Sequence, residues 1–159
     1  MLARILLALL LALSAPALAA EGTKADETTA AGTPAKAVTP MQAAGPTKGP
    51  VMGKLLRLPK YIYAWQGMMA GETPPQWVKD YALTLDGPPV PTIPVPLDGE
   101  IYTLGFTCKP NDCETHQLFV LFAPEGRDAW GLLASPNGVS WLGKPDERIQ
   151  KAIDGALRK

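Results

Sequence analysis

The feature that most constrains the fold is the pair of cysteines, Cys108 and Cys113, which are the only two in the chain. Both flanks of the pair, residues 100–106 and 116–122, are rich in the aromatic and branched side chains that favour β-strands. This pattern predicts a β-hairpin with one cysteine at the last residue of each strand. Residues that face each other in an antiparallel pair have Cα atoms about 4.5–5.5 Å apart, and a disulfide needs about 4.4–6.8 Å. The hairpin therefore permits a bridge between the two cysteines.

Spacing alone leaves two interpretations of such a bridge open. A loop this short gains only about 2 kcal/mol from the chain-entropy effect of a disulfide, which makes the bridge a weak staple for a whole domain. The bridge could instead hold residues 109–112 in one shape, because a rigid loop loses little entropy when it binds a partner. The alternative is a bridge that only closes the end of a hairpin. The C-x4-C spacing disfavours a zinc site, which needs a second ligand pair, and differs from the C-x-x-C of oxidoreductases.

The N-terminus has the organisation of a secretory signal peptide, which we assign to residues 1–19. Arg4 precedes an apolar run over residues 5–13, and Ala17-Leu18-Ala19 supplies the small residues of a cleavage site. The apolar run is too short for a membrane span, so we expect an exported chain that begins at Ala20. The cysteine pair would then meet an oxidising compartment, in which disulfides persist.

Composition divides the rest of the chain into a spacer and one folded domain. Residues 20–50 are rich in Ala, Thr, Gly and Pro and lack Leu, Ile and aromatic side chains. Such a segment cannot bury enough apolar surface to offset the entropy cost of ordering it, so we expect a disordered spacer. Residues 51–159 are long enough for one modest core. The formal net charge is zero, from 15 basic and 15 acidic residues, and no basic patch favours nucleic acid as a partner.

The pattern of the domain predicts an α+β fold with an antiparallel sheet flanked by helices. One helix is expected to begin at Pro59, a second at Thr73-Pro74-Pro75, and a last one at Pro145. Between the second and the last helix, turn signals separate strand-like stretches, which predicts a five-stranded antiparallel meander. These stretches are residues 88–96, 100–107, 115–123, 128–133 and 139–142.

The chain offers little from which to build an active site. Its single histidine, His116, is expected within a strand as a partly exposed side chain. Carboxylates such as Asp98, Glu100 and Asp112 lie at turns, where they are ordinary solvated residues. The sequence contains no nucleophile with a base at an evident spacing, no Gly-rich phosphate loop and no metal-ligand cluster. We therefore expect a binding protein that is not an enzyme and that has no cofactor and no metal site.

Several motifs together resemble the Ivy family, which are inhibitors of vertebrate lysozyme. The motifs span essentially the whole folded domain and are Tyr61-x3-Trp65-x2-Met68-x2-Gly71-x-Thr73-x-Pro75-x-Trp77-Val78, then Tyr102, then Cys108-Lys109-Pro110-x-Asp112-Cys113, then Gly131-Leu132 and Trp141-Leu142-Gly143. The cysteine loop is the most specific of them. The resemblance implies a helix-flanked, five-stranded antiparallel sheet, a periplasmic location in a Gram-negative cell and commonly a homodimer.

The resemblance also implies a target-binding loop, closed by a disulfide, that plugs the active-site cleft of C-type lysozyme. The residues of this loop are Cys108, Lys109, Pro110, Asn111, Asp112 and Cys113. At the tip the inhibitory members of the family carry a histidine that reaches the two catalytic carboxylates of the enzyme, whereas this chain carries Asn111. Retaining glycosidases hold those carboxyl groups about 5–5.5 Å apart, a gap that histidine spans with donors on two ring nitrogens, whereas asparagine donates from one. Exchange of a charge-assisted for a neutral hydrogen bond predicts a loss of about one to two orders in affinity.

Two functional hypotheses therefore remain. The first is a periplasmic inhibitor of C-type lysozyme, or of a related wall-cleaving enzyme such as a lytic transglycosylase. The second is a non-inhibitory envelope protein that keeps the fold and the disulfide. The intact Lys109, Pro110 and Asp112 favour the first hypothesis, and Asn111 favours the second.

Overall fold

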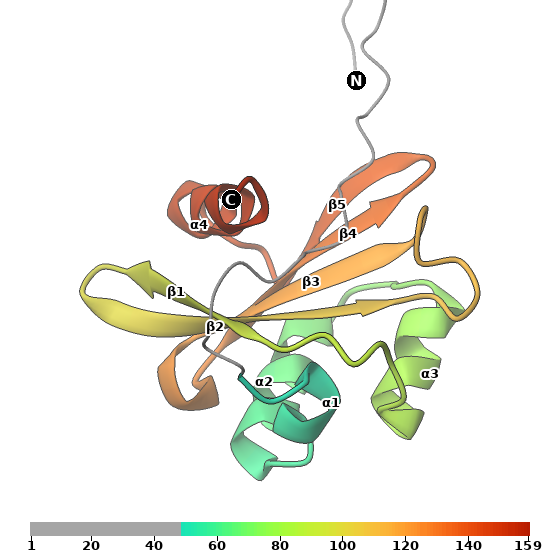
Figure 1. Cartoon of the computed structure of the whole chain (residues 1–159), viewed down its shortest axis with the longest axis horizontal. Coiled ribbons are helices and arrows are strands. Elements are labelled where there is room, and N and C mark those ends of the chain that lie inside the picture. Colours follow the sequence, from blue (N-terminus) through green and yellow to red (C-terminus); the bar gives the residue numbers. More distant parts are fainter. Residues whose placement is uncertain (1–48) are drawn as a thin grey trace, which may run out of the picture. The chain divides into compact units, whose positions relative to one another are not determined.

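The computed structural model describes residues 49–159, and Figure 1 labels the elements of this part of the chain. The signal peptide expected at 1–19 and most of the spacer expected at 20–50 lie outside the described residues. The helices are α1 (Met52–Leu55), α2 (Pro59–Met69), α3 (Gln76–Thr84), the 3-10 turn η1 (Pro124–Gly126) and α4 (Glu147–Leu157). The strands are β1 (Ile93–Leu97), β2 (Glu100–Cys108), β3 (Gln117–Phe122), β4 (Ala129–Ser135) and β5 (Gly138–Leu142). Within residues 49–159, no helix has the length and apolar character needed to cross a membrane.

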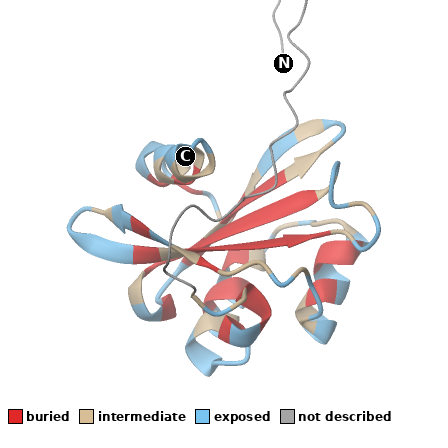
Figure 2. Ribbon diagram, viewed as in Figure 1, coloured by how far each residue is buried: buried red, intermediate tan, exposed pale blue. Residues whose placement is uncertain are grey.

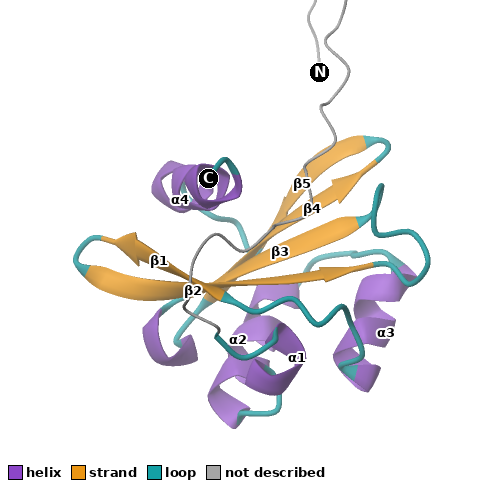
Figure 3. Cartoon of the chain, viewed as in Figure 1, coloured by secondary structure: helices purple, strands orange, loops and turns teal. Residues whose placement is uncertain are grey.

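The strands form one antiparallel sheet in the order β1-β2-β3-β4-β5. Each strand pairs with the next one along the chain, so the sheet is a meander, as Figure 3 shows. Helices α1, α2 and α3 cover one face of this sheet, and α4 covers the other (Figure 1). The predicted α+β class, with a five-stranded antiparallel meander between flanking helices, is therefore confirmed.

The chemistry of single residues explains where the longer helices begin and end. Pro59 occupies the first position of α2, where its missing N–H costs no hydrogen bond. Gly71 follows this helix with φ at 78°, a left-handed conformation that glycine adopts without a steric penalty. Asp146 caps α4, because its carboxylate accepts a hydrogen bond from the Ile149 N–H at 2.8 Å.

Strand β3 lies at the centre of the core on both faces of the sheet. All of its residues are buried, and Figure 2 shows the strand in red. Leu118, Val120 and Phe122 belong to the apolar cluster that includes α1, α2 and α3, whereas Phe119 and Leu121 belong to the cluster that includes α4. Side chains of a strand alternate between the two faces, so one strand contributes to both clusters. The hairpin that carries the cysteines is thereby anchored in the middle of the domain.

The observed bounds differ from the predicted ones at most elements, and the largest difference is at β1, which begins at Ile93 and not at residue 88. β3 begins at Gln117 and not at Thr115, so the connection from β2 is longer than predicted. Helix α3, which is the second of the predicted helices, begins at Gln76 and not at Thr73-Pro74-Pro75. Pro75 keeps an extended backbone, with φ at −56° and ψ at 155°. Helix α1 was not predicted, because its four residues are too few to show a helical period.

The central position of β3 predicts a large cost for truncating one of its side chains. Phe119→Ala should lower the free energy of unfolding by about 3–5 kcal/mol, because the ring is fully buried and its removal leaves a cavity. Val139→Ala in β5, where the side chain is 53% exposed, is the control and should cost less than about 1 kcal/mol. Urea denaturation measures both, and equal losses would contradict the assignment of β3 as the centre of the core.

Candidate functional site

The candidate site is the connection between β2 and β3, residues 109–116, together with Cys108 at the end of β2. The sheet brings the two ends of this loop together. Cys108 faces Gln117 across the strand pair, and one residue further the Lys109 N–H donates to the His116 carbonyl at 3.1 Å. Because Gln117 is buried, the base of the loop is fixed to the core. Pro110 and Asn111 at the opposite end are exposed.

The tip of the loop, Lys109 to Asp112, is a type II β-turn. The Asp112 N–H donates to the Lys109 carbonyl at 3.0 Å and closes the turn. Pro110 holds the second position, and Asn111 holds the third with φ at 63°. A type II turn needs a positive φ at its third position, which asparagine tolerates, and proline presets the backbone of the second. The residues between the cysteines therefore favour the conformation that they adopt.

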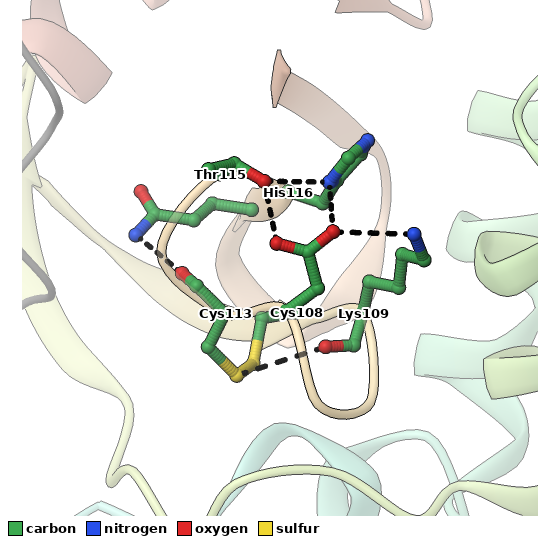
Figure 4. Close-up of polar contacts among 7 residues, drawn as sticks. Cys108, Lys109, Cys113, Thr115 and His116 are labelled. Atoms are coloured by element: carbon green, nitrogen blue, oxygen red, sulfur yellow. Dashed lines mark hydrogen bonds and ion pairs between the residues drawn. A yellow bond between two sulfur atoms is a disulfide. The ribbon is translucent and has the colours of Figure 1, made fainter. Parts of the chain in front are cut away.

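A disulfide joins Cys108 and Cys113, whose Cα atoms lie 4.9 Å apart (Figure 4). The prediction that each cysteine ends a strand and faces the other is wrong for Cys113, which lies within the loop, while Cys108 faces Gln117. The two Cα atoms are still close enough for a disulfide, because the turn at the tip brings the chain back towards the end of β2. Cys108 is buried and Cys113 is exposed. The bridge therefore ties the outer half of the loop to the buried strand.

A second set of contacts crosses the loop at Asp112 and joins it to Lys109, Thr115 and His116, which Figure 4 labels. One carboxylate oxygen accepts from the Thr115 hydroxyl at 2.5 Å, and the other lies 2.7 Å from His116 Nδ1 and 3.2 Å from Lys109 Nζ. The hydrogen bond from Thr115, and after it the one from Lys109, holds the pKa of Asp112 below its usual value. The Asp112 carbonyl also accepts from the His116 N–H at 3.2 Å. We call Lys109, Asp112, Thr115 and His116 the Asp112 cluster.

The roles of Thr115, His116 and Gln117 were missed from the sequence. His116 is partly exposed as predicted, but it precedes β3 and does not lie within it. Thr115 Oγ1 lies 2.9 Å from His116 Nδ1, and the Gln117 side chain donates to the Cys113 carbonyl at 2.9 Å. The sequence did contain a signal for these contacts. Thr115 and His116 follow Asp112 by three and four residues, a spacing that favours local side-chain hydrogen bonds in a turn.

Two carboxylates outside the loop, Asp98 and Glu100, form ion pairs with arginines. Asp98 and Glu100 are exposed as predicted, and they pair with Arg148 and Arg127 respectively. In the part of the chain that the structure describes, no group of three or more His, Cys, Asp or Glu side chains is placed to hold a metal ion. What the site offers is a loop of fixed shape with an exposed amide and an exposed proline ring at its end. Such an arrangement favours binding, because little conformational entropy remains to be lost.

The fold and the loop define a class of binding domain, in which an antiparallel sheet presents a fixed, disulfide-closed loop. The chain matches the family described as Inhibitor of vertebrate lysozyme (Ivy) over residues 61–158. This match covers more than half of the chain, and the chain belongs to the Ivy family. The family is one of inhibitors, which agrees with the expectation of a binding protein.

Individual relatives agree with this assignment. The chain is 30% identical over 119 residues to the inhibitor of vertebrate lysozyme of Pseudomonas aeruginosa, and the aligned region covers 65% of this chain and 75% of that protein. It is 31% identical over 124 residues to an uncharacterized protein of Yersinia pestis, covering 69% of this chain and 78% of that protein. It is also 31% identical over 112 residues to an uncharacterized protein of Pseudomonas aeruginosa, covering 62% and 70% respectively.

The bridge is expected to be present in the isolated protein and to contribute little to global stability. Mass spectrometry without reduction should find one peptide pair that joins Cys108 to Cys113. Replacing both residues by serine should lower the free energy of unfolding by only about 2 kcal/mol, because the closed loop is short. Free thiols, or a bridge between two chains, would contradict this pairing.

The Asp112 cluster predicts that the order of the loop depends on pH. The pKa of Asp112 in the folded chain lies below its usual value, so the contribution of the carboxylate is complete above the usual value. It is lost as the pH falls through the lowered pKa. The amide 15N order parameters of residues 111–115 should therefore decrease once the pH drops below about 4. Asp112→Asn should abolish this dependence, while Glu114→Gln, a change at a neighbouring exposed carboxylate, should keep it. Identical profiles for the two variants would show that Asp112 does not hold the loop.

Proposed function

We propose that this protein inhibits C-type lysozyme by inserting the loop from Cys108 to Cys113 into the active-site cleft of the enzyme. Membership of the Ivy family supports a lysozyme as the target. The observation that carries the role of the loop is the exposure of Pro110 and Asn111 on a backbone that is fixed before binding. The turn, the bridge and the Asp112 cluster each restrain the loop, so the complex forms at a low entropy cost.

Asn111 is the residue that would meet the catalytic groups, because it is the polar side chain at the exposed tip. A retaining glycosidase presents two carboxyl groups about 5–5.5 Å apart, one protonated as the general acid and one ionised. An amide is complementary to this mixed pair, because its nitrogen donates to the ionised carboxylate and its oxygen accepts from the protonated acid. Asn111 could thus engage both groups without carrying a charge, where the histidine of inhibitory family members would carry one.

Lys109 and Asp112 act mainly within the loop in this proposal. The Lys109 ammonium lies 3.2 Å from the Asp112 carboxylate, and both side chains remain partly exposed. Direct contacts of these two charges with the rim of the cleft would be screened by solvent and contribute little. Their effect on inhibition would therefore come mostly through the shape of the loop.

We also propose that the protein acts in the periplasm as a homodimer, after cleavage of the signal peptide before Ala20. The signal sequence supports export, and a bridge between Cys108 and Cys113 would persist in that oxidising compartment. Cell fractionation with sequencing of the mature N-terminus tests the location. Light scattering of the purified protein tests the dimer.

Variants at Asn111 test the insertion of the loop. Lysozyme activity is titrated with the wild type, Asn111→His and Asn111→Gly, and in parallel with a lytic transglycosylase as the enzyme. Asn111→Gly keeps the positive φ of the turn and removes the amide, so inhibition of lysozyme should weaken about tenfold. Asn111→His should tighten it about 10- to 100-fold at acidic pH, where the imidazole is charged. Asn137→Gly in the β4–β5 turn is the control and should leave inhibition unchanged.

The pH profile of the wild type adds a second readout. Inhibition should weaken as the pH rises through about 6, because the general acid then ionises and the amide oxygen of Asn111 faces a second carboxylate. Absence of inhibition by all variants, with both enzymes, would refute the active-site plug and favour the non-inhibitory envelope protein. Inhibition of the lytic transglycosylase alone would show that this enzyme, and not C-type lysozyme, is the target of the loop.

A further inference from the structure

The two edges of the sheet differ in what their backbones offer to a further strand. A two-residue turn joins β1 to β2, so Leu97 and Glu100 close this hairpin as a hydrogen-bonded pair. Backbone groups along a strand point alternately to its two sides, so those of Pro94 and Pro96 point away from β2. Proline has no N–H, and the outer side of β1 therefore offers no donor at either position. This edge is closed to a further strand.

The opposite edge of the sheet, β5, is open. Ser135 and Gly138 close the β4–β5 hairpin in the same way, so the backbone groups of Val139 and Trp141 point away from β4. β5 lies at the edge of the sheet in Figure 1, and within residues 49–159 only β4 pairs with it. Residues 136–143 include no charged side chain, whereas natural edge strands often carry lysine, which opposes pairing with other chains. The outer side of β5 can therefore accept another strand.

The side chains of β5 add an apolar surface to this open edge. Trp141 packs against the apolar cluster that includes α4 and remains partly exposed. Val139 lies two residues away, so its exposed side chain is on the same face of the sheet. Ser140 is exposed on the other face. An uncharged edge strand with apolar side chains is a surface on which a strand of a partner can be added.

We propose that a second copy of this chain pairs with β5 in antiparallel orientation, so that the two sheets join across a two-fold axis at Ser140. In this register β5 is self-complementary, because Val139 of each copy faces Trp141 of the other. The outward N–H of each residue then donates to the outward carbonyl of the residue that it faces. The pairing also places each exposed valine against an indole ring, and such β-branched and aromatic pairs stabilise adjacent strands.

The proposed pairing leaves both cysteine loops free. Gln117 pairs with Ala134, so the cysteine loop lies at the same end of the sheet as the β4–β5 turn. Because the two copies of β5 run in opposite directions, their two loops would lie at opposite ends of the joined sheet. The inference gives an interface to the homodimer proposed above and rests on that proposal, but it does not depend on the inhibition of lysozyme.

Matched lysine variants test the interface. A single pair of strands buries less surface than the roughly 1,600 Å² of a standard interface, so the full chain should pass from monomer to dimer at micromolar concentrations. Val139→Lys should raise the dissociation constant at least about tenfold, because a charge is then placed against the indole of the other copy. The control is Ile101→Lys in β2, a strand with neighbours on both sides, where the replaced side chain is 58% exposed against 53% for Val139.

Sedimentation velocity measures the three proteins from about 1 μM to about 1 mM, a range chosen for a weak interface. The control should dimerise as the wild type does. A wild type that stays monomeric over this range, or equal dissociation constants for the two variants, overturns the inference.

A cysteine at position 140 tests the register. In the proposed pairing Ser140 faces its own counterpart in a pair without hydrogen bonds, with Cα atoms about 4.5 Å apart, which a disulfide can span. Ser140→Cys should therefore form a covalent dimer when oxidised glutathione is added. Asn137→Cys is the control and should not, because this residue would lie about 20 Å from its counterpart. Equal cross-linking of the two variants overturns the inference.

Hydrogen exchange identifies any other occupant of this edge. Protection of the Val139 and Trp141 amides should rise with protein concentration, because only the dimer covers them. Full protection at every concentration would assign the edge to another segment of the same chain, such as residues 20–48, and overturn the inference. A dimer through β5 without inhibition of either enzyme supports the inference and rejects the proposed inhibition. A monomer that inhibits lysozyme does the reverse.

Discussion

The structure depends on the burial of β3 on both faces of the sheet. A shift of this strand by one residue would exchange every side chain between the two clusters, so Leu118 and Phe119 could not both keep their places. The register of β2 against β3 is fixed as a consequence, and with it the pairing of Cys108 with Gln117. The base of the candidate loop is therefore positioned by the core, and the tip can consist of residues that the core does not need.

The loop shows how a short exposed segment keeps one shape without a core of its own. The bridge restrains the exposed Cys113, and the Asp112 cluster restrains the arm that leads into β3. Neither restraint is strong on a global scale, because a short disulfide loop contributes little and exposed ion pairs are screened. Only eight residues have to be ordered between the two strands, so local restraints of this size are sufficient.

The sequence predicted those parts of the fold that depend on local patterns and missed those that depend on tertiary contacts. Strand propensity and turn signals identified the meander, and Pro59 marked the start of α2. The start of β3 was missed because Thr115 and His116 bind the Asp112 side chain, which competes with strand pairing. A pocket of about 230 Å³, lined by residues of α3 and of the cysteine loop, was missed for another reason. Asp80 and Asp86 lie more than 20 residues before Cys108 in the sequence, and only the packing of α3 brings them to the loop.

In the proposed mode of inhibition, two separate demands meet at position 111. The type II turn requires a positive φ there, and insertion into a cleft requires a polar side chain long enough to reach the reacting groups. Glycine satisfies only the first demand, whereas asparagine and histidine are both enriched at positive φ and both carry donors and acceptors. An asparagine in place of the histidine that the family resemblance implies therefore suits the same backbone, but it donates from one nitrogen only and does not titrate. Because an amide does not titrate, we expect the contact made by Asn111 in the proposed complex to depend on pH only through the general acid of the enzyme.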